Sequence, residues 1–173
     1  DSPGVSFLTE FGTLHENPVS PLIKPVDSIP FPAWDLFPMD AYILYKHESA
    51  HHTARCFPVL FSRGCPQTCN FCFRLYDSYR LRSFENVFEE IRILRDKYNV
   101  NHIDFVDENI MISEKAAIRF GEAMKEADLG VTWNCHGNTP ACTTKALTIM
   151  KKAGMTSINL GIESLDQTVI DNM

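Results

Sequence analysis

The chain is short of positive charge and has no long apolar run. Its 173 residues carry 16 Lys and Arg against 22 Asp and Glu, a formal net charge of -6, and no basic run is present. Nucleic-acid binding depends on clustered Lys and Arg, so we expect no nucleic-acid partner. No apolar stretch approaches the roughly 20 residues that cross a bilayer, and no signal peptide precedes the cysteines. We therefore expect a soluble, cytoplasmic protein with reduced thiols.

Three of the six cysteines share one short loop, in which Cys65, Cys69 and Cys72 follow the spacing C-x3-C-x2-C. This spacing supplies three of the four ligands that a cubane iron-sulfur cluster needs, so one iron is left open. An open iron can bind a small molecule through N and O donors, whereas a closed structural zinc site cannot. The spacing therefore indicates chemistry at the metal.

Zinc is the alternative metal for this loop. The candidates for a fourth zinc ligand are Cys56, His47, His51 and His52. Zinc sites usually pair two short Cys/His knuckles, and only one is visible here. A disulfide framework is not needed, because a chain with 45% hydrophobic residues has enough core material to fold without one. Cys56, Cys135 and Cys142 follow no ligand spacing and are predicted to be buried apolar residues.

The first part of the chain is rich in proline and aromatic residues. Seven of the ten prolines fall within the first 38 residues, and proline restricts both its own backbone and that of the preceding residue. We predict an ordered but irregular strap over residues 1–46. Apolar side chains such as Phe11 and Trp34 favour packing of this strap against a folded body.

From Phe57 onward, strands alternate with helices. The predicted strands span residues 57–61, 102–106, 131–135 and 156–160. The predicted helices span residues 83–98, 113–129 and 144–153. Ser83 and Ser113 are the expected N-caps, and Gly130 and Gly154 follow the ends of the second and third helix. This alternation predicts an α/β fold of about four parallel βα units with right-handed crossovers.

Polar side chains gather at the ends of all four predicted strands. The cysteines follow the first strand and Asp107-Glu108-Asn109 the second. Asn134 and His136 lie near the end of the third, and Gly161-Ile162-Glu163-Ser164 follows the fourth. In barrels built from such units, chemistry collects at the C-terminal ends of the strands. We expect the four groups to converge on one face.

The run Arg63-Gly64-Cys65-Pro66-Gln67-Thr68-Cys69-Asn70-Phe71-Cys72 resembles the signature of the radical S-adenosylmethionine (SAM) superfamily, with the aromatic Phe71 just before the last cysteine. The resemblance covers residues 57–173. It implies that Cys65, Cys69 and Cys72 bind a [4Fe-4S] cluster. It also implies a partial (β/α) radical SAM barrel, with about four units of six. Residues 1–46 are then a connector, and residues 47–173 the N-terminal part of the core domain. We expect both ends of the chain to be cuts.

The same resemblance implies roles for single residues. The SAM ammonium faces the residues after the second strand, and either Asp107 or Glu108 is its acceptor through a charge-assisted hydrogen bond. Glu163 is similar to the family's ribose ligand, and Phe71 belongs to the cofactor site. Asn134, like His136, is placed where it can touch the SAM carboxylate or the substrate.

The reaction implied by the resemblance is reductive cleavage of SAM to methionine and a 5'-deoxyadenosyl radical, which removes a hydrogen atom from a small-molecule substrate. A reducing partner such as flavodoxin or ferredoxin supplies the electron. Residues 27–38 resemble the connector that precedes the barrel in the branch with an upstream cobalamin-binding domain. This resemblance implies cobalamin-dependent methyl transfer. Ring rearrangement and oxidation are the other reactions that it allows.

Two rival classes remain. One is a radical SAM enzyme without cobalamin, and a D-x-H-x-x-G cobalamin signature is absent from these 173 residues. The other is a non-catalytic iron-sulfur or zinc protein. A protein of that second class would not need acids at the ends of the second and fourth strands.

Overall fold

The computed structural model describes residues 2–44, 54–73 and 78–173. The chain divides into two compact units, Asp1–Pro30 and Phe31–Met173. Of the residues weighed above, His47, His51 and His52 lie outside the described residues.

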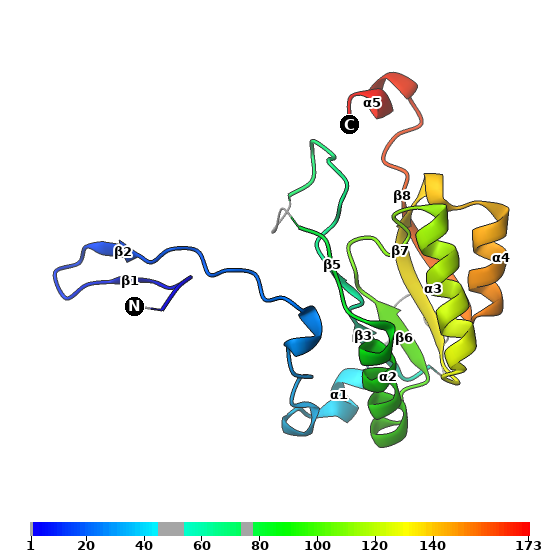
Figure 1. The fold of residues 1–173 in the computed structure, drawn as a ribbon, viewed down its shortest axis with the longest axis horizontal. Coiled ribbons are helices and arrows are strands. Elements are labelled where there is room, and N and C mark those ends of the chain that lie inside the picture. The colour runs from blue at the N-terminus through cyan, green and yellow to red at the C-terminus, as the bar shows by residue number, and fades with distance from the viewer. Residues whose placement is uncertain (1, 45–53, 74–77) are drawn as a thin grey trace. The chain divides into compact units, whose positions relative to one another are not determined.

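The first unit contains a short antiparallel hairpin, β1 (Ser6–Leu8) with β2 (Leu14–Glu16), at its start (Figure 1). Its turn is closed by the Thr9 hydroxyl, which accepts a hydrogen bond from the Thr13 N–H at 3.1 Å, and by Gly12 with φ of 76°. A 3-10 helix spans Val26–Ser28. The hairpin was not predicted from the sequence, because both strands are exposed on both faces and lack an apolar alternation.

The second unit is built on a four-stranded parallel sheet in the order β3-β6-β7-β8. Its strands are β3 (Cys56–Val59), β6 (His102–Phe105), β7 (Thr132–Asn138) and β8 (Met155–Gly161). The crossover helices are α2 (Phe84–Tyr98), α3 (Glu114–Ala127) and α4 (Thr144–Lys152). The remaining elements are 3-10 helices at Trp34–Leu36 and Thr139–Ala141, α1 (Met39–Leu44), β4 (Ser62–Arg63), β5 (Arg80–Leu81) and α5 (Gln167–Asp171). The predicted α/β fold of four parallel strands is confirmed.

Each crossover helix begins at a side chain that caps it. The Ser83 and Ser113 hydroxyls accept hydrogen bonds from Asn86 N–H and Ala116 N–H, as predicted, and the Thr143 hydroxyl caps α4 in the same way. The prediction for the end of α3 was two residues too long. The helix stops at Ala127, because the next residue turns into the left-handed region with φ of 41°.

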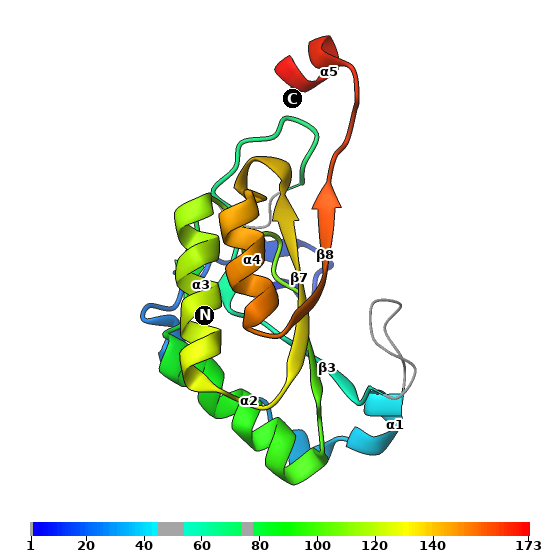
Figure 2. The ribbon, with the colours of Figure 1, turned by 90° about the vertical axis from the view of Figure 1, so that its right-hand side faces the viewer.

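The core lies between the sheet and these helices, which run along one face of the strands (Figure 2). At its centre the rings of Phe105, Phe120 and Trp133 meet edge to face, with centroids 5.2 to 5.9 Å apart. Phe120 also contacts Phe61 at 5.1 Å, in the segment that leads from β3 to the cysteines. The aromatic core thus packs against Phe61, which precedes the cysteine loop.

The opposite face of the sheet is polar. His102 and Asp104 alternate along β6 with the buried Ile103 and Phe105, and all four side chains are buried. The His102 ring is 2.7 Å from Thr132 Oγ1 through Nδ1 and 2.8 Å from Asn134 Oδ1 through Nε2. Asn134 Nδ2 donates to Asp104 Oδ1 at 2.5 Å. A hydrogen-bonded row therefore crosses from β6 to β7.

The strand β7 is longer than the sequence predicted. Its pairing with β8 continues to Asn138 and Gly161, whereas the prediction ended the strand at residue 135. Gly137 allows this, since its bare Cα faces Met111, which forms a parallel bridge with it. As a consequence, Asn134 lies in the middle of the strand and not at its end.

None of the helices in the described part of the chain has the length and apolarity that a membrane crossing requires.

Candidate functional site

The three spaced cysteines lie on a loop whose base is a two-stranded pair. The chain enters through β4, passes the cysteines and returns through β5, with Ser62 opposite Leu81 and Arg63 opposite Arg80. Gly64, with φ of 82°, turns the chain between β4 and Cys65. The loop therefore projects beyond the C-terminal end of β3.

All three cysteines line one pocket of about 570 Å³ at the C-terminal ends of the strands. Cys72 is exposed, whereas Cys65 and Cys69 are half-buried. Partial burial raises the pKa of the Cys65 thiol, and negative charge on Glu108, Cys69 and Cys72 adds to this, against a hydrogen bond from the Gln67 backbone. Glu108, Cys69 and Cys72 therefore lie close enough for their charges to act on the Cys65 thiol. Within residues 2–44, 54–73 and 78–173, no three His, Cys, Asp or Glu side chains are close enough to form a preassembled metal site.

The other cysteines lie away from this loop. Cys56 begins β3, at the opposite end of the strand from the loop, and does not line the pocket, so it does not join the three thiols as a fourth ligand. Burial raises its pKa to about 11, and the carboxylate of Asp104 adds to this. Burial likewise raises the pKa of Cys135 to about 12. Both are buried, as predicted, whereas Cys142 is half-buried.

The two neighbouring acids after β6 face different surroundings. Glu108 is exposed and lines the pocket with the cysteines. Asp107 is fully buried and does not line it. Its carboxylate accepts hydrogen bonds from the Phe61 N–H at 3.0 Å, the Ser62 N–H and the Ser62 hydroxyl at 2.5 Å. Burial raises the pKa of Asp107, and these hydrogen bonds act in the opposite direction.

Of the predicted polar residues of β7, one reaches the pocket. His136 lines it, and its Nε2 is 3.3 Å from the Asn159 amide on β8. Asn134, which was predicted to touch SAM or substrate, lies two residues earlier among buried side chains and does not line the pocket. The reason is the extra length of β7.

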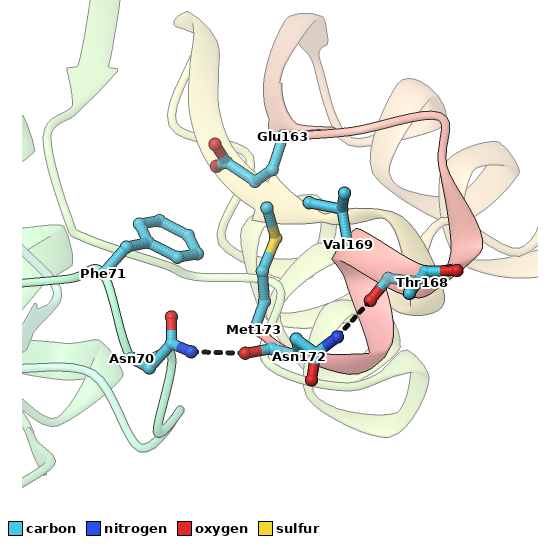
Figure 3. A pocket seen from close by; sticks show the side chains of 7 residues that line it. All are labelled: Asn70, Phe71, Glu163, Thr168, Val169, Asn172 and Met173. Atoms are coloured by element: carbon cyan, nitrogen blue, oxygen red, sulfur yellow. Dashed lines mark hydrogen bonds between the residues drawn. The ribbon is translucent and has the colours of Figure 1, made fainter.

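Phe71 and Glu163 come from two different elements and point into the same space (Figure 3). The cysteine loop contacts the end of α5 there, because the Asn70 N–H donates to the Met173 carbonyl at 2.9 Å. Glu163 has φ of 60°, a left-handed conformation that is uncommon for glutamate. Strained backbone of this kind clusters at functional sites.

Two further residues line the pocket without a role of their own in the sequence-based prediction. Asn109 is buried, and its side-chain oxygen has no hydrogen-bond partner in the described residues. Asn159 lies opposite His136 in the parallel register. The signal for Asn159 was its position two residues after Ser157, on the face that Asn134 and His136 share.

The electrostatic character of the pocket favours a cation. Glu108 and Glu163 carry carboxylates at its wall, and the three thiols become anionic when they bind metal. None of the described residues that line it is Lys or Arg. The donor set suits an iron-sulfur cluster held by three thiolates, with acidic acceptors beside it.

Comparison with known proteins agrees with this donor set. The model of the radical SAM superfamily matches residues 59–173. The chain belongs to this superfamily. Membership implies a [4Fe-4S] cluster and SAM, and the three cysteines, which line one pocket, are the residues that fit the cluster.

Two relatives and one solved structure extend the comparison. An uncharacterized methyltransferase of Pyrococcus horikoshii is 32% identical over 97% of this chain and 36% of its own length. The anaerobic magnesium-protoporphyrin IX monomethyl ester cyclase of Rubrivivax gelatinosus is 30% identical over 97% of this chain and 30% of its own length. The apo structure of the cobalamin-dependent SAM radical enzyme OxsB matches with a TM-score of 0.68 at 20% identity, covering 98% of this chain and 25% of that one. The radical SAM chain thus spans about a third of the length of these curated relatives.

Thiol reactivity should follow this arrangement. In native apoprotein at about pH 8, Cys72 should be alkylated by iodoacetamide first, and Cys56 and Cys135 last, because the thiolate is the reactive form and buried thiols stay protonated. Mass spectrometry of timed digests measures the order. Unfolding in guanidinium chloride should equalise the rates. Equal rates for Cys135 and Cys72 in native protein would contradict the buried position of Cys135.

Proposed function

We propose that this chain is the part of a radical SAM enzyme that binds a [4Fe-4S] cluster and SAM and cleaves SAM reductively. Cys65, Cys69 and Cys72 hold the cluster in this proposal, and Glu108 and Glu163 hold SAM. The observation that carries it is the common pocket, because thiols after β3 and carboxylates after β6 and β8 line the same space. A zinc or electron-transfer protein does not need those carboxylates.

When bound, the cluster supplies an open iron for SAM and the electron that cleaves it. The protein residues bind and orient the rest of the molecule. Glu108 accepts hydrogen bonds from the amino group, Glu163 accepts them from the ribose hydroxyls, and Phe71 offers an apolar surface. The acidic wall without Lys or Arg suits the cationic sulfonium. A flavodoxin or ferredoxin is the proposed electron donor.

The cluster ligands can be tested one at a time in the intact protein. Cys65→Ala, Cys69→Ala and Cys72→Ala should each abolish formation of methionine and 5'-deoxyadenosine after anaerobic reconstitution, because the cluster loses a ligand. Cys142→Ala is the control and should keep both products. Iron and sulfide analysis, with electron paramagnetic resonance before and after SAM is added, gives the measurement. Stoichiometric zinc without iron uptake in the wild-type protein would overturn the proposed function.

The two carboxylates have a separate test. Glu108→Gln and Glu163→Gln should each weaken SAM binding roughly ten- to hundredfold, because a hydrogen bond to a charged partner is replaced by a neutral one. Calorimetry on cluster-loaded protein measures this affinity. Glu122→Gln, an exposed acid of α3, is the matched control. A variant that binds SAM like the wild type removes its residue from the proposed site.

For the whole protein we propose methyl transfer that depends on cobalamin. The Pyrococcus relative is named a methyltransferase, and the segment over residues 27–38 resembles the connector of the cobalamin branch. The first unit adds a physical reason, since Leu8, Phe11 and Val19 expose large apolar surfaces of the kind that mark protein interfaces. In this proposal residues 1–46 connect the core domain, residues 47–173, to a cobalamin-binding domain. The name of the Rubrivivax relative makes ring formation the second candidate.

A purified full-length protein decides between these outcomes. We expect it to bind one corrin, visible by absorption spectroscopy and by mass spectrometry of the released cofactor. Incubation with SAM carrying a labelled methyl group should transfer the label to cobalamin. A full-length protein that cleaves SAM but binds no added corrin would leave the radical SAM proposal intact and exclude the cobalamin-dependent one.

A further inference from the structure

The segment that enters the cysteine loop is held from two sides, by Asp107 after β6 and by Arg82 after β5. On one side, Asp107 accepts hydrogen bonds from the backbone N–H groups of Phe61 and Ser62 and from the Ser62 hydroxyl. On the other, the Arg82 guanidinium donates to the Leu60 carbonyl at 2.7 Å, and the Arg82 N–H donates to the Phe61 carbonyl at 2.9 Å. Side chains of Asp107 and Arg82 thus take the Phe61 and Ser62 N–H groups and the Leu60 carbonyl, and the Arg82 backbone takes the Phe61 carbonyl.

Both anchors are themselves fixed. Arg82 is paired with Glu90 of α2 at 2.6 Å, and the two side chains are 11% and 6% exposed. Asp107 is fully buried directly after β6, where the Val106 N–H binds the Val59 carbonyl at 3.2 Å. The position of Ser62 is therefore set by the end of the neighbouring strand, three residues before the first cysteine.

We propose that Asp107 is a positioning residue that fixes the cysteine loop relative to Glu108. The proposal rests on the proposed function for its consequence, and on the three hydrogen bonds of Asp107 for its cause. Glu108 is the next residue in the chain. The same short segment therefore holds the base of the cysteine loop, through Asp107, and presents a carboxylate to the pocket, through Glu108. The geometry gives the two adjacent acids different roles, one behind the loop and one facing the pocket.

The chemistry of the contact explains why a carboxylate is needed. Three donors, two N–H groups and one hydroxyl, converge on the two oxygens of Asp107. An asparagine at this position keeps the shape but exchanges one acceptor oxygen for an NH2 group, which would face an N–H donor. The Phe61 N–H would then face the NH2 group at 3.0 Å, and the one remaining oxygen is neutral and accepts more weakly than a carboxylate, so the base of the loop would open more often.

The chain offers a matched control in β6, the strand that precedes Asp107. Asp104 is also a buried carboxylate of this region, and it accepts a hydrogen bond from Asn134 at 2.5 Å, on the face of the sheet away from the aromatic core. The Asn134 partner of this hydrogen bond lies on β7 and not on the cysteine loop. Asp104→Asn therefore reports the cost of losing a buried charge without disturbing the base of the loop.

The test compares Asp107→Asn, Asp104→Asn and Ser62→Ala in the full-length protein. In apoprotein, alkylation of Cys65 should become about tenfold or more faster in Asp107→Asn, because a buried hydrogen bond to a charged group no longer holds the loop. Asp104→Asn should stay close to the wild-type rate. Ser62→Ala should have a smaller effect, since both backbone donors to Asp107 remain, and it should add little when combined with Asp107→Asn.

Cluster-loaded protein gives a second readout that simple loss of stability does not produce. The electron paramagnetic resonance spectrum of the reduced cluster and its response to SAM should change in Asp107→Asn and persist in Asp104→Asn. Unchanged Cys65 labelling in Asp107→Asn would overturn the proposal, as would equal effects in Asp104→Asn. Weaker SAM binding with unchanged labelling would instead return Asp107 to the SAM site. If Asp107→Asn does not fold, Ser62→Ala decides: a Cys65 rate equal to that of the wild type contradicts the proposal.

The two proposals fail in different ways. A wild-type protein that takes up no cluster overturns the proposed function. Labelling of the apoprotein does not depend on the cluster, so it still tests whether Asp107 holds the loop.

Discussion

The parallel hydrogen bonding of β3, β6, β7 and β8 determines where useful side chains of this chain can lie. Parallel strands all end at the same edge, so whatever follows them is brought together without any sequence proximity. Cys65 and Glu163 are 98 positions apart in the numbering and still line one pocket. The helices on one face bury the apolar side of the sheet and leave this edge free for polar residues.

The pocket combines groups that repel one another unless something positive lies between them. Partial burial raises the pKa of Cys65, and the negative charges of Glu108 and the neighbouring thiols raise it further, so the Cys65 thiolate is unfavourable without a positive partner. In the proposed function, iron is that partner for the thiolates, and the sulfonium and amino group of SAM are that partner for the acids. The thiols and acids thus repel one another when the pocket holds no positive group, and their arrangement suits a metal cluster beside a cationic ligand.

The sequence was informative where a residue type has one physical role. The serines before α2 and α3, and the change between strand and helix periods, each predicted what the structure shows. The sequence could not show in which direction a particular side chain points. Asp107 and Glu108 are chemically alike and adjacent, and only the path of the chain after β6 turns one toward Ser62 and the other toward the pocket. Asn134 was expected near the end of its strand and lies within β7. The length of β7 is set by its pairing with β8, which the sequence does not show.

The polar row formed by Thr132, His102, Asn134 and Asp104 has a consequence for how the sheet assembles. Side chains in a strand alternate between faces, so a slip of one residue in β6 would exchange His102 and Asp104 with Ile103 and Phe105. Imidazole and carboxylate groups would then lie among aromatic rings without partners, at a cost of roughly several kcal/mol. The row thus favours the correct register of β6 during folding. It makes this register more stable than registers shifted by one residue, and it does so without a bound cofactor.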